Sequence, residues 1–207
     1  MINADSPRPR GRPRAFDRDA ALGLARRTFW QLGYEGASIA DLTAAMGITP
    51  QSLYAAFGSK AELYREALAQ YRLTDGAFVW RALAEEPTVA RAFRRVLTET
   101  AHEYARPDRP PGCMVSTAIT TYAVEHHEIA DHVSVMRQES RDRFQARIEK
   151  GIEEGDVPPG IDIPATARFL QTILQGMSIL ARDGAGEEEL KAIADIACEQ
   201  LDRRLSA

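Results

Sequence analysis

Residues 38–63 read SIADLTAAMGITPQSLYAAFGSKAEL, and this stretch decides the class of fold. Two short helical patterns meet at Gly47, which is the layout of a helix-turn-helix. Ser38 and Asp41 have the spacing of a capping box, in which each side chain bonds the backbone N–H of the other residue. Gly47 supplies the left-handed backbone conformation that ends a helix. The pattern therefore predicts a first helix over residues 39–46.

The second helix of the pair begins directly after the turn. Thr49 is a suitable N-cap, and Pro50 falls at the first helical position, where its missing N–H is not needed. Leu53 and Phe57 lie four residues apart and are expected to be the buried anchors. The residues expected on the outer face are Gln51, Ser52, Tyr54 and Ala55. Such a face can donate hydrogen bonds to DNA or stack against it.

Many positions of this region agree, in order and in register, with one known pattern. They are Phe29, Gly33, Tyr34, Ser38, Gly47, Ile48, Leu53, Tyr54, Phe57, Lys60 and Leu63. Through them, roughly the first third of the chain resembles the DNA-binding domain of the TetR family of bacterial transcriptional regulators. Two positions depart from the family pattern: Gln51 stands where glycine is common, and Ala56 stands where histidine is common. The first departure adds a candidate base contact, and the second removes a phosphate contact.

A basic stretch precedes the first helix. Its arginines alternate with proline and glycine, in a composition too poor in apolar residues to fold. Such a stretch by itself is commonly a solvated tail, but beside a helix-turn-helix it is expected to follow phosphates or enter the minor groove. The predicted DNA-binding residues are Arg8, Arg10, Arg12, Arg14, Ser38, Thr49, Gln51, Ser52, Tyr54 and Lys60.

Charge is distributed unevenly along the 207 residues. The chain carries a formal charge of -4, yet residues 1–60 hold eight basic and five acidic side chains, and the remaining residues carry a balance of -7. This asymmetry fits a basic DNA-binding domain attached to an acidic body, which the DNA phosphates repel. No window approaches eighteen consecutive apolar residues, and the N-terminus lacks the apolar core of a signal peptide, so we expect a cytoplasmic protein without membrane contact.

The pattern predicts an all-α protein. A basic arm is expected over residues 1–16, a three-helix DNA-binding domain over 17–60 with its first helix at 17–32, and a helical effector-binding and dimerisation domain over 61–207. After the helix-turn-helix, we expect helices over residues 60–84, 87–104, 114–123, 129–153, 164–182 and 187–205.

The last two expected helices carry regular apolar stripes. Two broad stripes at the end of the chain indicate a surface for a second copy, and the family resemblance implies a two-fold four-helix bundle. The alternative is that both stripes complete the core of one subunit. The predicted dimer-interface residues are Leu170, Leu174, Met177, Ile193, Ala197 and Leu201.

The sequence offers weak signals for metal or catalytic chemistry. The cluster of His126, His127 and His132 has poor spacing for a shared metal and is more typical of solvated polar residues. No phosphate-binding loop or nucleophile elbow is present. We therefore expect no cofactor, no metal and no enzymatic activity. Cys113 is either a reactive thiol that senses an oxidant or electrophile, or a buried structural residue.

The favoured function is a homodimeric repressor that binds a near-palindromic operator in double-stranded DNA and is released by an unidentified small molecule. The alternative is a constitutive or architectural DNA-binding protein without an effector. Residues of types that commonly line pockets are Trp80, Tyr104, Met114, Thr117, Tyr122, Met136, Phe144, Gln171 and Gln175.

Overall fold

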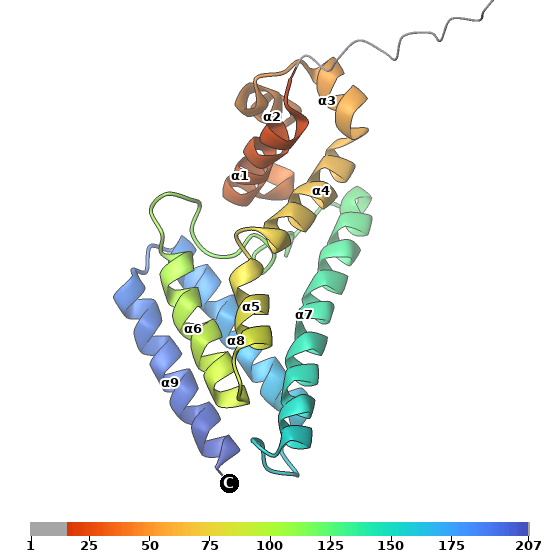
Figure 1. Ribbon diagram of the computed structural model, residues 1–207. Coiled ribbons are helices and arrows are strands. Elements are labelled where there is room, and N and C mark those ends of the chain that lie inside the picture. The colour runs from red at the N-terminus through yellow and green to blue at the C-terminus, as the bar shows by residue number, and fades with distance from the viewer. Residues whose placement is uncertain (1–15, 207) are drawn as a thin grey trace, which may run out of the picture.

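The computed structural model describes residues 16–206, and helices are the regular secondary structure of that part of the chain. Three helices form an N-terminal unit: α1 (Arg18–Gly36), α2 (Ile39–Met46) and α3 (Pro50–Phe57). A fourth helix, α4 (Lys60–Leu73), leads from this unit toward the body of the molecule (Figure 1). The predicted fold class, all-α with an N-terminal helix-turn-helix, is confirmed.

The predicted start and stop signals around the helix-turn-helix are confirmed. Ser38 and Asp41 form the reciprocal capping box of α2, and Gly47 ends that helix in the left-handed region at φ 65°. The Thr49 side chain accepts the backbone N–H of Ser52, and Pro50 is the first residue of α3. Helix α1 extends beyond its expected end because Gly33, at φ 74°, allows a kink after which the chain continues to Gly36.

The helix expected over residues 60–84 is broken in the structure, which corrects that prediction. Helix α4 ends at Leu73, and α5 (Ala77–Glu85) begins after a short turn. The Asp75 carboxylate in this turn lies 3.0 Å from guanidinium nitrogens of both Arg26 and Arg109. These partners are remote in sequence, so the local periodicity could not reveal the break.

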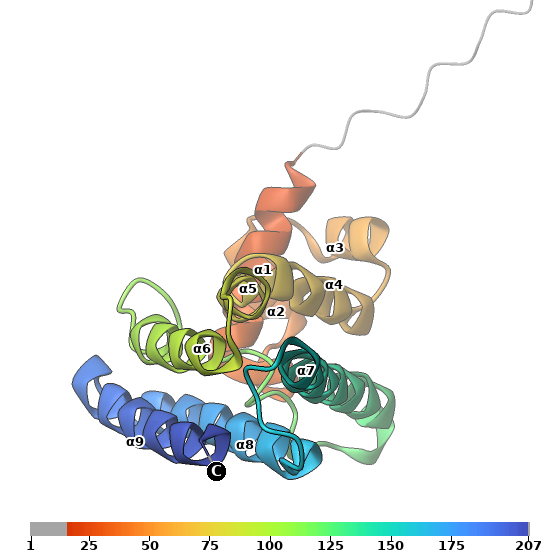
Figure 2. The ribbon, with the colours of Figure 1, turned by 60° about the horizontal axis from the view of Figure 1, so that its bottom comes forward.

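The body consists of α5 with α6 (Val89–Tyr104), α7 (His127–Glu154), α8 (Ile163–Arg182) and α9 (Glu187–Leu205). Helix α6 packs along α9, and α8 lies between α9 and α7 (Figure 2). None of the helices in the described residues is both long and apolar enough to cross a membrane.

The helix expected over residues 114–123 is also absent, and the prediction is corrected. The chain makes successive turns there, with Ile119 at a positive φ of 42°, before a short 3-10 helix, η1 (Val124–His126). Arg137 of α7 donates hydrogen bonds to the carbonyl oxygens of Val115 and Ala118, at 3.4 and 3.1 Å. The Ala118 carbonyl therefore has a side-chain donor, and the Val115 carbonyl accepts both this side chain and the Ala118 N–H of a turn.

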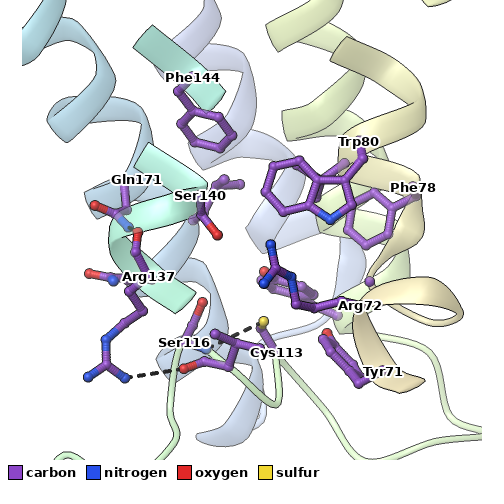
Figure 3. A pocket seen from close by; sticks show the side chains of 16 residues that line it. Tyr71, Arg72, Phe78, Trp80, Cys113, Ser116, Arg137, Ser140, Phe144 and Gln171 are labelled. Atoms are coloured by element: carbon purple, nitrogen blue, oxygen red, sulfur yellow. Dashed lines mark hydrogen bonds between the residues drawn. The ribbon is translucent and has the colours of Figure 1, made fainter. Parts of the chain in front are cut away.

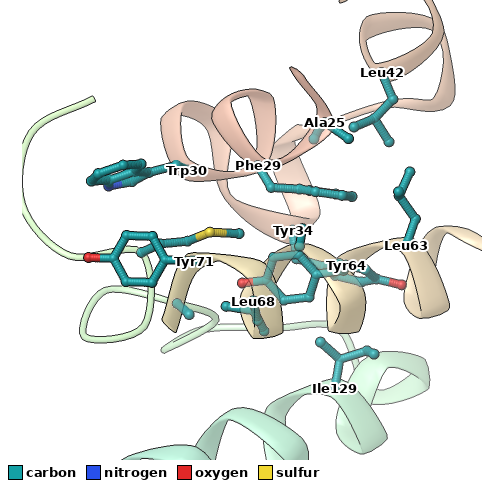
Figure 4. Packing of buried hydrophobic residues seen from close by; sticks show 14 of the residues in the cluster. Ala25, Phe29, Trp30, Tyr34, Leu42, Leu63, Tyr64, Leu68, Tyr71 and Ile129 are labelled. Atoms are coloured by element: carbon teal, nitrogen blue, oxygen red, sulfur yellow. The ribbon is translucent and has the colours of Figure 1, made fainter. Parts of the chain in front are cut away.

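Two apolar cores hold the molecule together. The first joins α1–α4 to residues 114–119 and to the start of α7, with Phe29 and Tyr34 packed on Tyr64 at its centre (Figure 4). The second lies among α5–α9. The packing of the N-terminal unit therefore continues past residue 60, where the sequence placed a domain boundary.

The residues predicted for the dimer interface require a correction. Leu170, Leu174, Met177, Ala197 and Leu201 are buried inside the single chain, in the second core, and Ile193 is partly buried. The large apolar residues that α8 and α9 leave exposed are Ile179, Leu180 and Ile196. Both helices carry apolar residues on more than one face, so periodicity alone could not assign the inner stripe.

Candidate DNA-binding face and ligand cavity

Helix α3 presents a polar face held by two buried anchors. Leu53 and Phe57 are the buried residues of the helix, at 0 % and 3 % exposure. Gln51 and Tyr54 are exposed, and the hydroxyls of Thr49 and Ser52 lie 3.0 Å apart at the start of the helix. The side chains of these four residues thus form one hydrogen-bonding surface at the N-terminal half of α3. Arg8, Arg10, Arg12 and Arg14 fall outside the described residues.

Two further predicted DNA contacts have partners within the chain. The Ser38 hydroxyl lies 2.6 Å from the Asp41 carboxylate, and this hydrogen bond, followed by that from the Ser38 backbone N–H, lowers the pKa of Asp41. The Lys60 ammonium lies over the ring of Tyr34, 4.5 Å from its centroid. Burial lowers the pKa of Lys60, while the charge of Glu35 opposes that change.

Arg18 fixes the end of α3, a role that sequence reasoning did not predict. Its guanidinium donates to the carbonyl oxygen of Ala56 at 3.3 Å, pairs with Glu66 at 2.7 Å and covers the ring of Phe57 at 4.3 Å. One side chain of α1 therefore links α3 to α4. The signal in the sequence was weak, because the partners of Arg18 are 38 and 48 residues away.

A cavity of about 80 Å³ lies in the body, between the α4–α5 turn and helices α6, α7 and α8 (Figure 3). Five of its lining residues are aromatic, and two arginines, two serines, Cys113 and the two glutamines of α8 add polar groups. Its lining consists of Tyr71, Arg72, Gly76, Phe78, Val79, Trp80, Tyr104, Cys113, Val115, Ser116, Arg137, Ser140, Phe144, Gln171, Leu174 and Gln175.

Five of the nine residues predicted for a ligand pocket line this cavity: Trp80, Tyr104, Phe144, Gln171 and Gln175. The other four lie elsewhere. Met114 and Thr117 line a separate hollow against α1, Tyr122 is exposed, and Met136 is buried in the first core. The turns that replace the expected helix over residues 114–123 account for the placement of Met114, Thr117 and Tyr122, whereas Met136 belongs to α7.

Charged side chains border the cavity. Arg72 pairs with Glu139 across α4 and α7 at 2.6 Å, and this hydrogen bond is the main cause of the lowered pKa of Glu139. Arg143 lies over the ring of Trp80 at 4.7 Å. Burial lowers the pKa of Arg137, whose backbone carbonyl accepts a 2.7 Å hydrogen bond from Gln171.

Several contacts connect the body to α1. Arg182 of α8 donates to the carbonyl oxygens of Trp30 and Gln31, and His126 Nδ1 lies 2.7 Å from the Glu35 carboxylate. His126 therefore has a carboxylate partner, and no cluster of three or more potential metal ligands occurs in residues 16–206.

Comparison with known proteins agrees with this architecture. Residues 21–67 match the family described as bacterial regulatory proteins, tetR family, and residues 88–196 match the tetracyclin repressor-like C-terminal domain. The chain belongs to the TetR family. The second match alone spans more than half of the chain, and the two together cover both the helix-turn-helix and the body.

Several relatives of this TetR-family chain are known. It is 37% identical over 186 residues to the HTH-type transcriptional repressor ComR of Escherichia coli (strain K12), covering 89% of each chain. It is 30% identical to the repressor BdcR of the same organism, covering 97% of each. A cysteine mutant of the TetR family regulator CifR, solved in complex with 26 bp double-strand operator DNA, shares 42% identity with a TM-score of 0.89, over 91% of this chain and 98% of that one.

Proposed function

We propose that this protein is a sequence-specific transcriptional repressor that binds an operator through α3 and leaves it when a small molecule enters the body cavity. The observation that carries the proposal is the exposed polar face of α3, fixed by Leu53, Phe57 and Arg18 in a chain whose relatives are repressors. Residues on such a face reach base edges when the helix lies in the major groove.

Contacts between the cavity and the N-terminal unit support release by a ligand. Cys113, Val115 and Ser116 line the cavity, while Met114 and Ala118 of the same segment pack against α1 and α4. A ligand that moves this segment therefore acts on the orientation of α3. It shifts the equilibrium only by its difference in affinity for the two orientations.

A two-fold dimer supplies the second reading helix. TetR proteins act as dimers, and a near-palindromic operator requires two copies of α3. We infer that the interface is formed by the exposed apolar residues of α8 and α9, Ile179, Leu180 and Ile196, together with the partly buried Ile193. Because operators are carried by the chromosome, we infer a cytoplasmic location.

The test is fluorescence anisotropy with the DNA immediately upstream of the gene and a scrambled duplex of equal length. We expect the protein to bind the upstream DNA tightly as a two-fold dimer. The bound DNA should contain a near-palindromic sequence. Equal affinity for both duplexes would favour an architectural DNA-binding protein instead. The body cavity argues for the ligand-responsive repressor over that alternative.

A further inference from the structure

A chain of four charged side chains joins the N-terminal unit to the body. Arg26 of α1 and Arg109, in the loop after α6, each lie 3.0 Å from the carboxylate of Asp75 in the α4–α5 turn. Arg26 contacts Oδ2 of Asp75, and Arg109 contacts Oδ1. Glu103, near the end of α6, completes this Asp75 cluster at 2.9 Å from Arg109. Three parts of the molecule that are remote in sequence therefore meet at one carboxylate.

The Asp75 cluster is shielded from solvent. The side chains of Arg26 and Asp75 are 16 % exposed, and that of Arg109 is 15 % exposed. Water and salt screen such pairs less than pairs on the open surface. Within residues 16–206, Asp75 is the one carboxylate partner of Arg26, and the Arg26 Nε has no hydrogen-bond partner. Loss of the Asp75 charge would therefore leave the Arg26 guanidinium without a counter-charge.

The cluster lies where the orientation of the N-terminal unit is set. The α4–α5 turn connects that unit to the body (Figure 1). Arg26 also donates to the Thr74 hydroxyl, so two neighbouring residues of the turn hold α1. Helix α1 packs against α2 and α4, and moves with α3 as part of the first core. In a dimer that joins two bodies, the angle at this turn therefore determines the distance between the two copies of α3.

The same turn forms part of the cavity wall. Gly76, the residue after Asp75, lines the cavity, and its N–H donates to the Tyr71 carbonyl oxygen at 2.8 Å. A Cβ on Gly76 would lie 2.9 Å from Cε1 of the Tyr71 ring, which lines the cavity too. Because the turn packs this closely on the wall, a molecule that displaces the wall also moves the Asp75 carboxylate relative to Arg26.

We propose that Asp75 is a positioning residue for operator recognition. By holding Arg26 and Arg109 together, it fixes the distance between the two α3 helices of the dimer and so selects the spacing between the half-sites of the operator. The inference rests on the proposed function, because it requires a two-fold complex on a near-palindromic operator. A cluster that only stabilised the fold would affect binding to every half-site spacing alike.

The experiment measures the affinity of the full chain for its operator and for duplexes with one or two base pairs inserted or removed between the half-sites. The parent should bind the native spacing best, because each base pair changes both the distance and the rotation between half-sites. Asp75→Asn should lose affinity for the native spacing and tolerate the altered spacings better. The ratio of the two affinities should shrink by about tenfold, a usual size for coupling between distant parts of a protein.

Further variants test the individual contacts of the cluster. Arg26→Gln should act like Asp75→Asn, and the double variant should add little, because both changes remove the same contact. Arg109→Gln should have a smaller effect, since Asp75 then keeps its contact with Arg26. Asp108→Asn is the matched control, because the Asp108 carboxylate pairs with Arg106 and Arg109 of its own loop. It should keep the spacing preference of the parent.

Circular dichroism and sedimentation establish that each variant is a folded dimer, and Arg26→Gln carries the test if Asp75→Asn does not fold. Three results would each overturn the proposal. They are a parent that binds every spacing equally, a loss of equal size at every spacing in Asp75→Asn and Arg26→Gln, and an Asp108→Asn variant that behaves as these two do.

The outcomes separate this inference from the proposed function. A chain that prefers operator to scrambled DNA, but whose Asp75→Asn variant keeps the spacing preference of the parent, overturns the role of Asp75 alone. A parent chain that binds operator and scrambled DNA equally overturns the repressor assignment itself.

Discussion

Gln51 is the exposed side chain of α3 best suited to read a base, because its amide can donate to and accept from adenine together. We expect Gln51→Ala to weaken binding to the operator by about 1 to 3 kcal/mol at one position per half-site and to leave scrambled DNA nearly unaffected. Anisotropy titrations of both duplexes measure the difference. Equal losses on the two duplexes would show that Gln51 does not read sequence.

Tyr54 provides the matched comparison on the same face. Tyr54 is 48% exposed, and its hydroxyl is free to reach the phosphate backbone. Removing only that hydroxyl, in Tyr54→Phe, should weaken binding to cognate and to scrambled DNA to a similar extent, because phosphate contacts carry no sequence information. The same titrations test this, and a selective loss on the operator would assign base reading to Tyr54 as well.

Glu35 is a titratable contact between α1 and the body. Burial acts to raise the pKa of Glu35, but the hydrogen bonds from His126 and from the Ala123 N–H outweigh it, so the net pKa is lowered. A carboxylate with a lowered folded-state pKa contributes stability above its unfolded pKa and loses it as the pH falls through the folded value.

The test compares wild type with Glu35→Gln by denaturant unfolding across acidic pH. Near neutral pH the variant should be less stable by no more than about 1 kcal/mol, because the pair is partly exposed and screened. The gap should close below the ordinary carboxylate pKa. A constant gap throughout this range would mean that the Glu35 charge contributes nothing to folding.

At the scale of the elements, the sequence predicted those helix boundaries that are set by interactions between residues close together in the chain. Ser38, Gly47 and the Thr49–Pro50 pair act within a few residues of themselves, and the helix-turn-helix follows from them. The break after α4 depends on Asp75, whose partners are Arg26 and Arg109, and such distant pairs leave no periodic trace. The turns in residues 114–123 are likewise stabilised by a distant residue, because Arg137 of α7 donates hydrogen bonds to two of their carbonyl oxygens.

The cavity was only partly predictable for the same reason. Residue type correctly pointed to Trp80 and Phe144, since aromatic side chains commonly line pockets. It could not point to Tyr71 or Arg72, because the bend after Leu73 brings the end of α4 to the cavity. Met136 was also expected in the pocket from its residue type, but it is buried in the first core.

Helices α8 and α9 provide a paired test of core against interface. Ile196→Asp places a charge at an exposed position, whereas Met177→Asp places one at a site with 0 % exposure. We expect Ile196→Asp to give a folded monomer with most operator affinity lost. Met177→Asp should lower the free energy of unfolding by about 3 kcal/mol or more, because an unpaired carboxylate becomes buried.

Sedimentation and helical circular dichroism, measured on both variants, separate the two roles. A dimer of unchanged mass for Ile196→Asp would remove that residue from the interface. Full helical stability for Met177→Asp would contradict its place in the core.

At the scale of the whole molecule, the basic arm and the acidic body predict how binding responds to salt. Each phosphate that the protein neutralises adds about 0.9 to the slope of log affinity against log salt. Removing residues 1–14, which hold four arginines, should therefore flatten the slope and weaken binding to all sequences. Titrations at several salt concentrations measure it. An unchanged slope would mean that the arm makes no phosphate contact.

The way α3 is attached has a consequence for engineering. Only Leu53 and Phe57 of that helix are buried, and Arg18 binds its last turn through a backbone carbonyl and the ring of Phe57. The side chains that face outward are thus free to be exchanged without repacking the sensor body. A library randomised at Gln51, Ser52 and Tyr54 should yield repressors that bind new operator sequences and are still released by the same small molecule.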